Sequence, residues 1–330
     1  MTNLPVFPPP TARGRDVLCL GLNATDHLCL IPHRPDWGGK LRMKTLASMG
    51  GGQAATAACA LGRLGWRVAY AGVCGDDAPG RQAGPWLREF GVDPAGLVVK
   101  PGTGSQQAFI MVEERGGERT IIWTRDEACR LEPGDLDEQL IASARVLHLD
   151  GHFWQASLAA ARLARSHGLL VSLDGERIFA GTEELVSLCD VVVGCEDFAQ
   201  RLFGLDSPER ALARLAELGP AWVGRTLGRG GAELLVDGRR HYVPGFPVQT
   251  VDTTGAGDVF HAGLVHALLL GQDPAEALTT ANALAAISTT GLGGRAALAA
   301  RPQLEAFLAA HARRSWAGRA RRGGGAGPRA

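Results

Sequence analysis

The sequence predicts an α/β protein with a doubly wound, mainly parallel sheet covered by helices on both faces, and with a small β lid. Three observations predict this class. Short apolar runs alternate with stretches of helical period along most of the chain. Segments 26–48 and 105–125 break that alternation and favour strands without helices. The length of 330 residues fits one large domain with a small appendage.

The strands of the main sheet are expected where apolar runs are short and uninterrupted. These runs lie at 16–22, 67–73, 145–150, 169–174, 190–194 and 221–228. Helices are expected between and after them, at 53–65, 79–91, 153–168, 207–219 and 273–291. Each of these helical stretches ends in glycine, which is typical of a helix C-terminus. Strands that alternate with helices in this way form parallel sheets with both faces covered.

The two ends of the chain differ from this pattern. The Pro-rich start predicts a disordered arm at 1–15, and the Gly- and Arg-rich end predicts a disordered tail at 315–330. Between them we expect a single domain at 16–314. No apolar run approaches the length of a membrane span, and the start lacks the features of a signal peptide, so we expect a cytoplasmic protein.

The composition excludes several classes of partner. The chain is 45% hydrophobic and 21% charged, and its formal net charge is zero. A neutral surface gives no electrostatic reason to expect nucleic acid or a membrane as a partner. The cysteines are dispersed without a C-x-x-C pair, which indicates free thiols in a reducing compartment rather than a zinc site.

The predicted lid consists of the two segments that lack helical period. Segment 105–125 contains two strand-like runs joined around Gly116 and Gly117, which predicts a hairpin. Segment 26–48 contains alternating, Pro-interrupted pieces. We expect these pieces to form a small β sheet over one edge of the domain, where it can close on a substrate.

Acidic residues follow several predicted strands. Sites in open α/β sheets lie at the carboxyl ends of the strands, so Asp26, Asp174 and Glu176 are expected to line a polar cleft. Taken singly, each is better explained as a turn or a helix cap. Both the dinucleotide pattern G-x-G-x-x-G after the first strand and the Walker A pattern are absent from the sequence. The glycines Gly50–Gly52 then allow two interpretations, backbone contact with a polyhydroxy substrate or tight helix–sheet packing.

The stretch VDTTGAGDVFHAG, which begins at Val251, carries the most specific chemistry. If a helix begins here, the amides of Gly255, Ala256, Gly257 and Asp258 point together at its N-terminus and form an anion hole. Such a hole stabilises a phosphoryl group in transfer. A carboxylate beside it is useful as a general base for an attacking hydroxyl. A simple helix cap is the alternative explanation for Asp258.

This stretch resembles the C-terminal signature of the ribokinase / phosphofructokinase B (PfkB) carbohydrate kinase family. The run from Met49 to Arg81 resembles the N-terminal signature, and TLGRGGAELL from Thr226 resembles the nucleotide-side strand pair. The resemblance extends from about Asp16 to Leu308. It implies a three-layer α/β/α ribokinase-like core with a β lid, ATP and Mg²⁺ as cofactors, and phosphorylation of a sugar hydroxyl. A homodimer through the lid is left open.

The resemblance assigns roles to matching residues. Asp258 corresponds to the catalytic base and 255–257 to the anion hole. Asp26, Gly51 and Gly52 correspond to sugar-contacting positions. The ATP region is matched by Thr226, Gly228, Gly231 and Asn282. Glu196 falls in the segment linked to Mg²⁺, and Asp252 and Thr254 fall in a loop that in many members binds K⁺.

The sequence departs from the family pattern at the substrate end. Ala55 stands where the common pattern has Asn. Within the family, the closest resemblance is to sulfofructose-kinase-like and ketohexokinase-like members, in which Lys40 matches an anion-contacting lysine. The companion Asn and Arg of those members are replaced by Trp123 and His152, so a sulfonated substrate is not predicted. We expect a ketose or related sugar. The alternatives are a nucleoside or small-alcohol kinase and a non-catalytic sugar- or nucleotide-sensing module.

Overall fold

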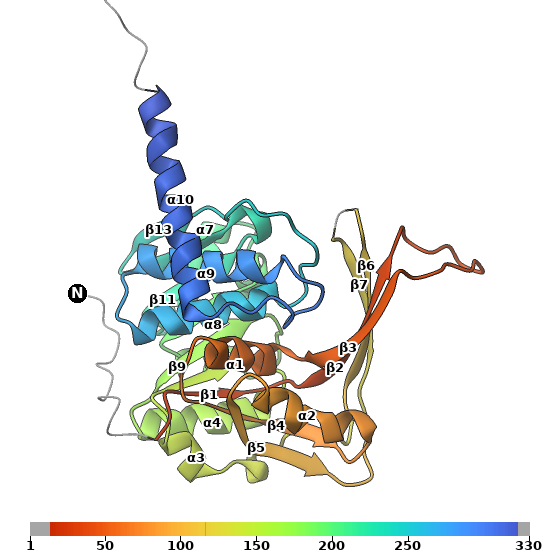
Figure 1. The fold of residues 1–330 in the computed structure, drawn as a ribbon. Coiled ribbons are helices and arrows are strands. Elements are labelled where there is room, and N and C mark those ends of the chain that lie inside the picture. The colour runs from red at the N-terminus through yellow and green to blue at the C-terminus, as the bar shows by residue number, and fades with distance from the viewer. Residues whose placement is uncertain (1–13, 116, 323–330) are drawn as a thin grey trace, which may run out of the picture.

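The apolar runs form the central sheet of the molecule. The computed structural model describes residues 14–115 and 117–322. Within this range, nine strands form one sheet in the order β13-β12-β11-β10-β9-β8-β1-β4-β5 (Figure 1). All pairs from β5 to β11 are parallel, whereas β12 and β13 run antiparallel to their neighbours. The strands are β1 Val17–Leu20, β4 Val68–Gly75, β5 Val92–Lys100, β8 Val146–Leu149, β9 Leu170–Gly175, β10 Val191–Gly194, β11 Trp222–Thr226, β12 Ala232–Val236 and β13 Arg239–Val243.

Helices cover both faces of this sheet, which confirms the predicted class. One face packs against α1, α8 and α9, and the other packs against α3 to α7. The helices are α1 Gln53–Arg63, α2 Ala78–Arg88, α3 Glu138–Ala142, α4 Trp154–Ser166, α5 Thr182–Ser187, α6 Phe198–Phe203, α7 Pro208–Glu217, α8 Ala256–Leu269, α9 Pro274–Ser288 and α10 Arg301–Arg322. Two short 3₁₀ helices are η2 Pro133–Asp135 and η3 Gly228–Gly230. None of the described helices is long and apolar enough to cross a membrane.

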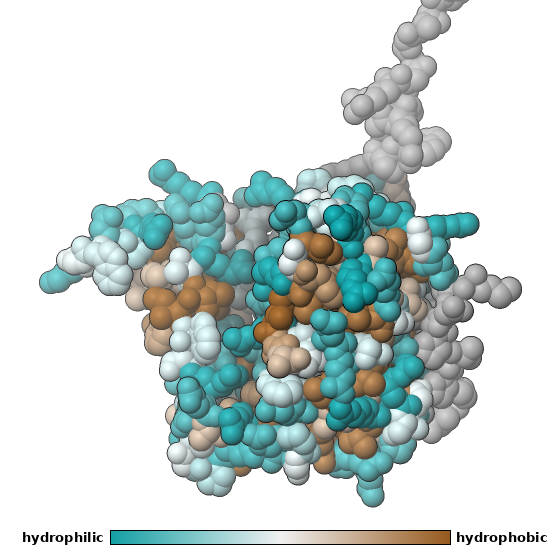
Figure 2. Space-filling view, turned by 180° about the vertical axis from the view of Figure 1, so that it is seen from behind, coloured by the Kyte–Doolittle hydropathy of each residue, from teal (hydrophilic) through white to brown (hydrophobic). Residues whose placement is uncertain are grey.

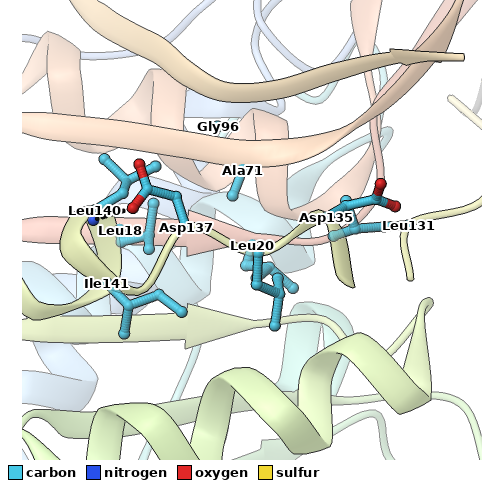
Figure 3. A pocket seen from close by; sticks show the side chains of 10 residues that line it. Leu18, Leu20, Ala71, Gly96, Leu131, Asp135, Asp137, Leu140 and Ile141 are labelled. Carbon is cyan, nitrogen blue, oxygen red and sulfur yellow. Dashed lines mark hydrogen bonds between the residues drawn. The ribbon is translucent and has the colours of Figure 1, made fainter. Parts of the chain in front are cut away.

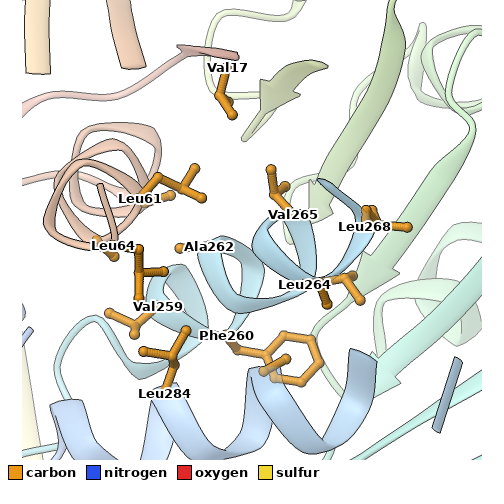
Figure 4. Packing of buried hydrophobic residues seen from close by; sticks show 14 of the residues in the cluster. Val17, Leu61, Leu64, Val259, Phe260, Ala262, Leu264, Val265, Leu268 and Leu284 are labelled. Carbon is orange, nitrogen blue, oxygen red and sulfur yellow. The ribbon is translucent and has the colours of Figure 1, made fainter. Parts of the chain in front are cut away.

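Helix α8 lies between its neighbours and is apolar around most of its circumference. Figure 4 shows Val259 and Ala262 near Leu61 and Leu64 at the end of α1, while Leu284 of α9 lies on another side. A helix that is hydrophobic all round is a buried helix. Burying its body against two helices and the sheet fixes where its N-terminus lies. The residues before Ala256 are therefore held firmly at the carboxyl edge of the sheet.

The lid is a separate four-stranded sheet in the order β3-β2-β6-β7 that projects from one side of the domain (Figure 1). Its strands are β2 Ala24–Ile31, β3 Thr45–Gly51, β6 Gln107–Glu113 and β7 Arg119–Thr124. Strands β6 and β7 are antiparallel, which confirms the expected hairpin. The inner face buries Leu28, Ala108, Ile110 and Val112 against Leu292. The lid is thus anchored to the loop that follows α9.

The two predicted ends require corrections. Residues 1–13 lie outside the described residues, but Arg15, expected in the disordered arm, donates hydrogen bonds to Asp93 and Ser143. At the other end, α10 continues to Arg322, so 315–322 is helical rather than disordered, while 323–330 lie outside the described residues. Arginine and alanine are strong helix formers, and their propensity prevails there over the glycine content.

Candidate active site at the carboxyl edge of the sheet

The N-terminus of α8 presents open backbone amides, as the sequence predicts. Gly255 precedes the helix with φ of 72°, and a Cβ there would lie 2.8 Å from the Cα of Gly294. Glycine is needed at this position for both reasons. A Cβ on Gly257 would meet no protein atom within 4 Å, so this side of the turn is open. Among the described residues, the amides of Gly257 and Asp258 have no hydrogen-bond acceptor, which leaves them free for an anion.

Asp258 occupies the first turn of α8 without capping it. The helix has no side-chain cap, and the half-buried carboxylate of Asp258 makes no hydrogen bond within the described chain. The helix-cap explanation is therefore wrong. Burial raises the pKa of Asp258 well above its usual value, and the neighbouring carboxylates of Asp174, Glu176, Asp150 and Asp26 raise it further. A carboxylate of raised pKa beside free amides is suited to accept a proton.

Asp26 lies in β2 opposite the glycines of β3. It pairs with Met49 in the register of the lid, and a Cβ on Gly51 would overlap its carboxylate. Asp26 is buried, and this burial raises its pKa to about 6, although the nearby Arg295 opposes the rise. Gly51 is thus required to make room for the carboxyl group of Asp26.

Gly50 and Gly52 have different roles. A Cβ on Gly50 would overlap the guanidinium of buried Arg295, which donates to the Gly51 carbonyl (2.7 Å) and to Thr56 (3.2 Å). Gly52 has φ of 90°, and a Cβ there would overlap the Leu22 carbonyl. Both glycines thus make room for neighbouring groups, the Arg295 side chain and the backbone after β1. Contact between the glycine backbone and a substrate remains a prediction.

A hydrogen-bonded network extends from the start of α1 toward the loops after β8 and β9. Gln53 contacts both His152 and Glu176 through its side-chain amide. Nη1 of Arg177 lies 3.2 Å from Nδ1 of His152. Asp150 accepts hydrogen bonds from the amides of Leu22 (2.7 Å), Ala54 (3.1 Å) and His152 (3.0 Å). His152 therefore lies beside the residues that follow Gly52, whereas Asp150 fixes the backbone.

The lid contributes Trp123 to the same side as Asp26. Ala108 pairs with both Asp26 and Trp123, so these side chains occupy one row on one face of the lid. Trp123 is 52% exposed. Arg119 at the far end of β7 donates to the hydroxyl of Thr253, which links the lid to the anion-hole segment. Exposed Lys40 lies in the connection between β2 and β3, and within the described chain it has no hydrogen bond or ion pair to the other predicted site residues.

The residues expected on the nucleotide side lie around β11, β12 and α9. Thr226 ends β11, and its hydroxyl lies 3.5 Å from the carbonyl of Gly194. Gly228 and Gly231 have positive φ, and a Cβ on Gly231 would overlap the Val243 carbonyl. Asn282 is buried and donates to that same carbonyl over 2.9 Å. These positions hold the strand pair in place, and their contact with ATP remains a prediction.

The residues expected near cations are carboxylates without a cationic partner. Glu196 follows β10, is exposed, and has no side-chain partner among the described residues. Asp252 is buried and accepts from Gly293 (2.8 Å) and from the amide and hydroxyl of Thr254 (2.9 and 2.8 Å). Within residues 14–115 and 117–322, no cluster of three or more His, Cys, Asp or Glu side chains could alone hold a metal ion.

Several contacts at this edge were not predicted from the sequence, including the partner of the expected Asp174. Asp174 forms an ion-pair contact with His261 (3.1 Å), one turn after Asp258 on α8. The spacing of 258 and 261 on a helix was a usable signal, because residues three apart share a face. Arg295 gave only the signal of a single cation within a Gly- and Ala-rich stretch. Arg125 and Arg177 gave none, because surface arginines are common in this chain.

A small pocket elsewhere is not a competing site. It lies on the opposite face of the sheet, among Leu18, Leu20, Ala71, Leu140 and Ile141 (Figure 3). Its volume of about 10 Å³ admits at most one water molecule and is far too small for a sugar. The open amides and carboxylates at the strand ends remain the candidate site.

Comparison with known proteins gives matches over most of the chain. Residues 17–301 match the family model described as pfkB family carbohydrate kinase. The chain is similar to a ribokinase of Haemophilus influenzae (29% identity, 88% of this chain, 97% of the relative). It is also similar to Fructokinase-1 of Oryza sativa (32%, 74% and 83%) and to a nucleoside kinase of Methanothermobacter thermautotrophicus (26%, 79% and 85%).

Solved structures share the fold over nearly their whole length. A putative ribokinase from Agrobacterium tumefaciens superposes with a TM-score of 0.84 at 28% identity, covering 91% of this chain and 99% of that one. A putative Ribokinase II from E. coli, in complex with ATP and Mg²⁺, superposes with a TM-score of 0.80 at 24% identity, covering 90% and 100%. The ribokinase-like fold expected from the sequence is thereby confirmed.

Proposed function

The chain belongs to the pfkB family of carbohydrate kinases, and we propose that it phosphorylates a hydroxyl of a small sugar, a ketose or related carbohydrate, at the expense of ATP. One observation carries the proposal. The unpartnered carboxylate of Asp258, with its raised pKa, lies in the same helical turn as the unpartnered amides of Gly257 and Asp258. A proton acceptor beside an anion hole is what transfer of a phosphoryl group to an alcohol requires.

In the proposed mechanism, Asp26 and the backbone of Gly51 and Gly52 hold the sugar hydroxyls. Asp258 takes the proton of the attacking sugar hydroxyl. As it does so, the hydroxyl oxygen bonds to the γ-phosphorus of ATP, and the bond between that phosphorus and ADP breaks. The amides of 255–258 stabilise the charge on the transferred group. On the opposite side, Thr226, Gly228, Gly231 and Asn282 shape the ATP site.

The cation sites belong to the proposal as well. When bound, Mg²⁺ would neutralise charge on the ATP phosphates, and a protein commonly gives this ion one or two carboxylates, as the free side chain of Glu196 can. A monovalent cation such as K⁺ would suit Asp252 and Thr254, because Asp252 is buried and has no cationic partner among the described residues.

A screen for ADP release tests the acceptor class. The panel holds ketoses, aldoses and nucleosides, each with ATP and Mg²⁺. The proposal requires ADP release with at least one ketose or related sugar. Release with nucleosides alone would replace it by the second candidate.

That second candidate is a nucleoside kinase. The specific observation in its favour is Trp123, half-exposed on the same lid face as Asp26, where an aromatic ring can stack on a base. One relative of this chain is named as a nucleoside kinase. A non-catalytic sensing module has no comparable support, because a sensor does not need the proton acceptor that Asp258 provides.

We also propose that the lid pairs two copies of the chain. Its outer face exposes Leu46, Phe109 and Ile122 at 62%, 52% and 59%, and Phe109 pairs directly with Ile122. Figure 2 shows apolar side chains gathered on the projecting lid. Sedimentation of the wild type and of Phe109→Ser should show a dimer that the substitution dissociates. A monomeric wild type would contradict the pairing.

A further inference from the structure

Two arginines, Arg125 and Arg177, lie beside His152 at the acceptor end of the site. Arg125 follows β7, and its guanidinium carbon lies 5.3 Å from the centre of the Phe153 ring. Its Nη1 is buried and has no hydrogen-bond partner among the described residues. Buried polar groups are normally satisfied, so an unpaired guanidinium nitrogen indicates a missing acceptor.

Arg177 places a second positive charge beside the first. It follows β9 and contacts Nδ1 of His152 at 3.2 Å. Arg125 lies over the ring of Phe153, the residue after His152, so both arginines flank the loop that follows β8. Burial lowers the pKa of Arg125, and the charge of Arg177 lowers it further. Neither arginine forms an ion pair with a carboxylate within the described residues. Two like charges in one place favour an anion between them.

The nearby carboxylates do not supply that anion, because both are engaged elsewhere. Glu176 accepts from the side chain of Gln53. Asp150 accepts hydrogen bonds from three backbone N–H groups, including that of His152. Asp174, three residues before Arg177, contacts His261, which lies one turn after Asp258 on α8, so the loop that carries Arg177 lies at the same edge of the sheet as Asp258.

We propose that Arg125 and Arg177 bind an oxyanion of the acceptor, a phosphate, sulfonate or carboxylate group, at the end away from the hydroxyl that Asp258 deprotonates. The acceptor is then an acidic sugar. This inference rests on the proposed sugar kinase function and deepens it. It assigns the anion-binding role to two arginines whose planar guanidinium groups match oxyanions, rather than to exposed Lys40 in the connection between β2 and β3.

Calorimetric titration of the full chain with a non-hydrolysable ATP analogue tests the inference. The probes are fructose and three acidic counterparts, namely fructose 6-phosphate, 6-deoxy-6-sulfofructose and fructuronate. The acidic sugar that fits best should bind roughly 10- to 100-fold more tightly than fructose, the range expected for charge-assisted hydrogen bonds. Its identity distinguishes the three oxyanions.

The variants Arg125→Gln and Arg177→Gln should each lose roughly 10-fold or more of the affinity for that acidic sugar, with fructose binding unchanged. Arg125→Lys, which keeps the charge, should lose less. The control is Arg63→Gln, an exposed arginine near the end of α1, which should bind like the wild type. Thermal unfolding of each variant verifies that it is folded.

Equal affinity of the wild type for fructose and all three acidic sugars would overturn the inference. So would an equal loss for fructose and acidic sugars in folded arginine variants. The proposed function fails separately, when neither neutral nor acidic sugars cause ADP release.

Discussion

The two ends of the site are built in different ways. The transfer end consists of four consecutive residues, 255–258, at the N-terminus of the buried helix α8. The acceptor end is assembled from residues that follow or lie in five separate strands: Asp26, Gly51, Arg125, His152 and Arg177. The residues of one continuous turn can stay the same while side chains from separate strands are replaced one at a time. Under the proposed function, one helix carries the transfer reaction, whereas the lid and the loops select the acceptor.

The largest effect is expected when the transfer end alone is disabled. Asp258→Asn should lower kcat by roughly 10²- to 10⁴-fold, because the general base is lost. The affinity for the ATP analogue should change little. Steady-state ADP release measures the effect, with the exposed Asp206→Asn as the matched control. An Asp258→Asn enzyme with the wild-type rate would refute the role of this carboxylate.

Disabling the acceptor end should leave a different signature. Asp26→Asn should raise KM for the sugar by roughly 10- to 100-fold, because hydrogen bonds to a charged group are lost. The KM for ATP should stay unchanged, and initial-rate measurements with each substrate varied will separate the two. A rise confined to the KM for ATP would assign Asp26 to the other end.

The same substitution should stabilise the fold at high pH. Asp26 has a pKa of about 6 in the folded protein and an ordinary value of 3.8, so rising pH between these values costs folding free energy. At pH 8, Asp26→Asn should therefore be more stable on the order of 1–3 kcal/mol. At pH 4 the difference should largely vanish. Denaturant unfolding at both pH values measures it, and an Asn variant less stable at pH 8 would contradict the burial cost.

Substitutions of two glycines should affect the two ends of the site differently. Gly51→Ala places a Cβ against the Asp26 carboxylate and should raise KM for the sugar by roughly 10-fold. Gly257→Ala meets no protein atom, so it should fold normally and instead lower kcat by a similar factor. Gly134→Ala, which also meets no protein atom, is the control and should change neither. Identical kinetic effects of the first two variants would erase the distinction between the ends.

The smallest expected effect concerns pH. Because Asp258 must be ionised to act, kcat/KM should rise with pH through its raised pKa. Asp174→Asn removes the neighbouring charge that ranks next after burial as a cause of this rise. In the Asp174→Asn variant, the acidic limb of the pH profile of kcat/KM should move to lower pH by less than about one unit. A pH–rate profile decides this, and a limb that moves to higher pH would contradict the assigned cause.

The sequence was sufficient for the transfer end and for the architecture. The GAGD turn, the alternating elements and the lid hairpin are local patterns, and local patterns survive in a single sequence. Asp26 was expected from its place after the first strand and Gly51 from the glycine run, and the resemblance names both. The structure adds that the glycine makes room for the carboxylate. The sequence did not predict the roles of Arg125, Arg177 and Arg295, or the contact between Asp174 and His261. These roles arise only from contacts between distant segments.

The most direct test of the account is the identity of the product. Wild-type protein is incubated with ATP, Mg²⁺ and each sugar of the panel, and the sugar is then analysed by mass spectrometry, with Asp258→Asn in parallel. The account predicts that a sugar gains one phosphoryl group in the wild-type reaction and stays nearly unmodified with Asp258→Asn. ADP formation without any phosphorylated sugar, or equal phosphorylation by both proteins, would contradict it.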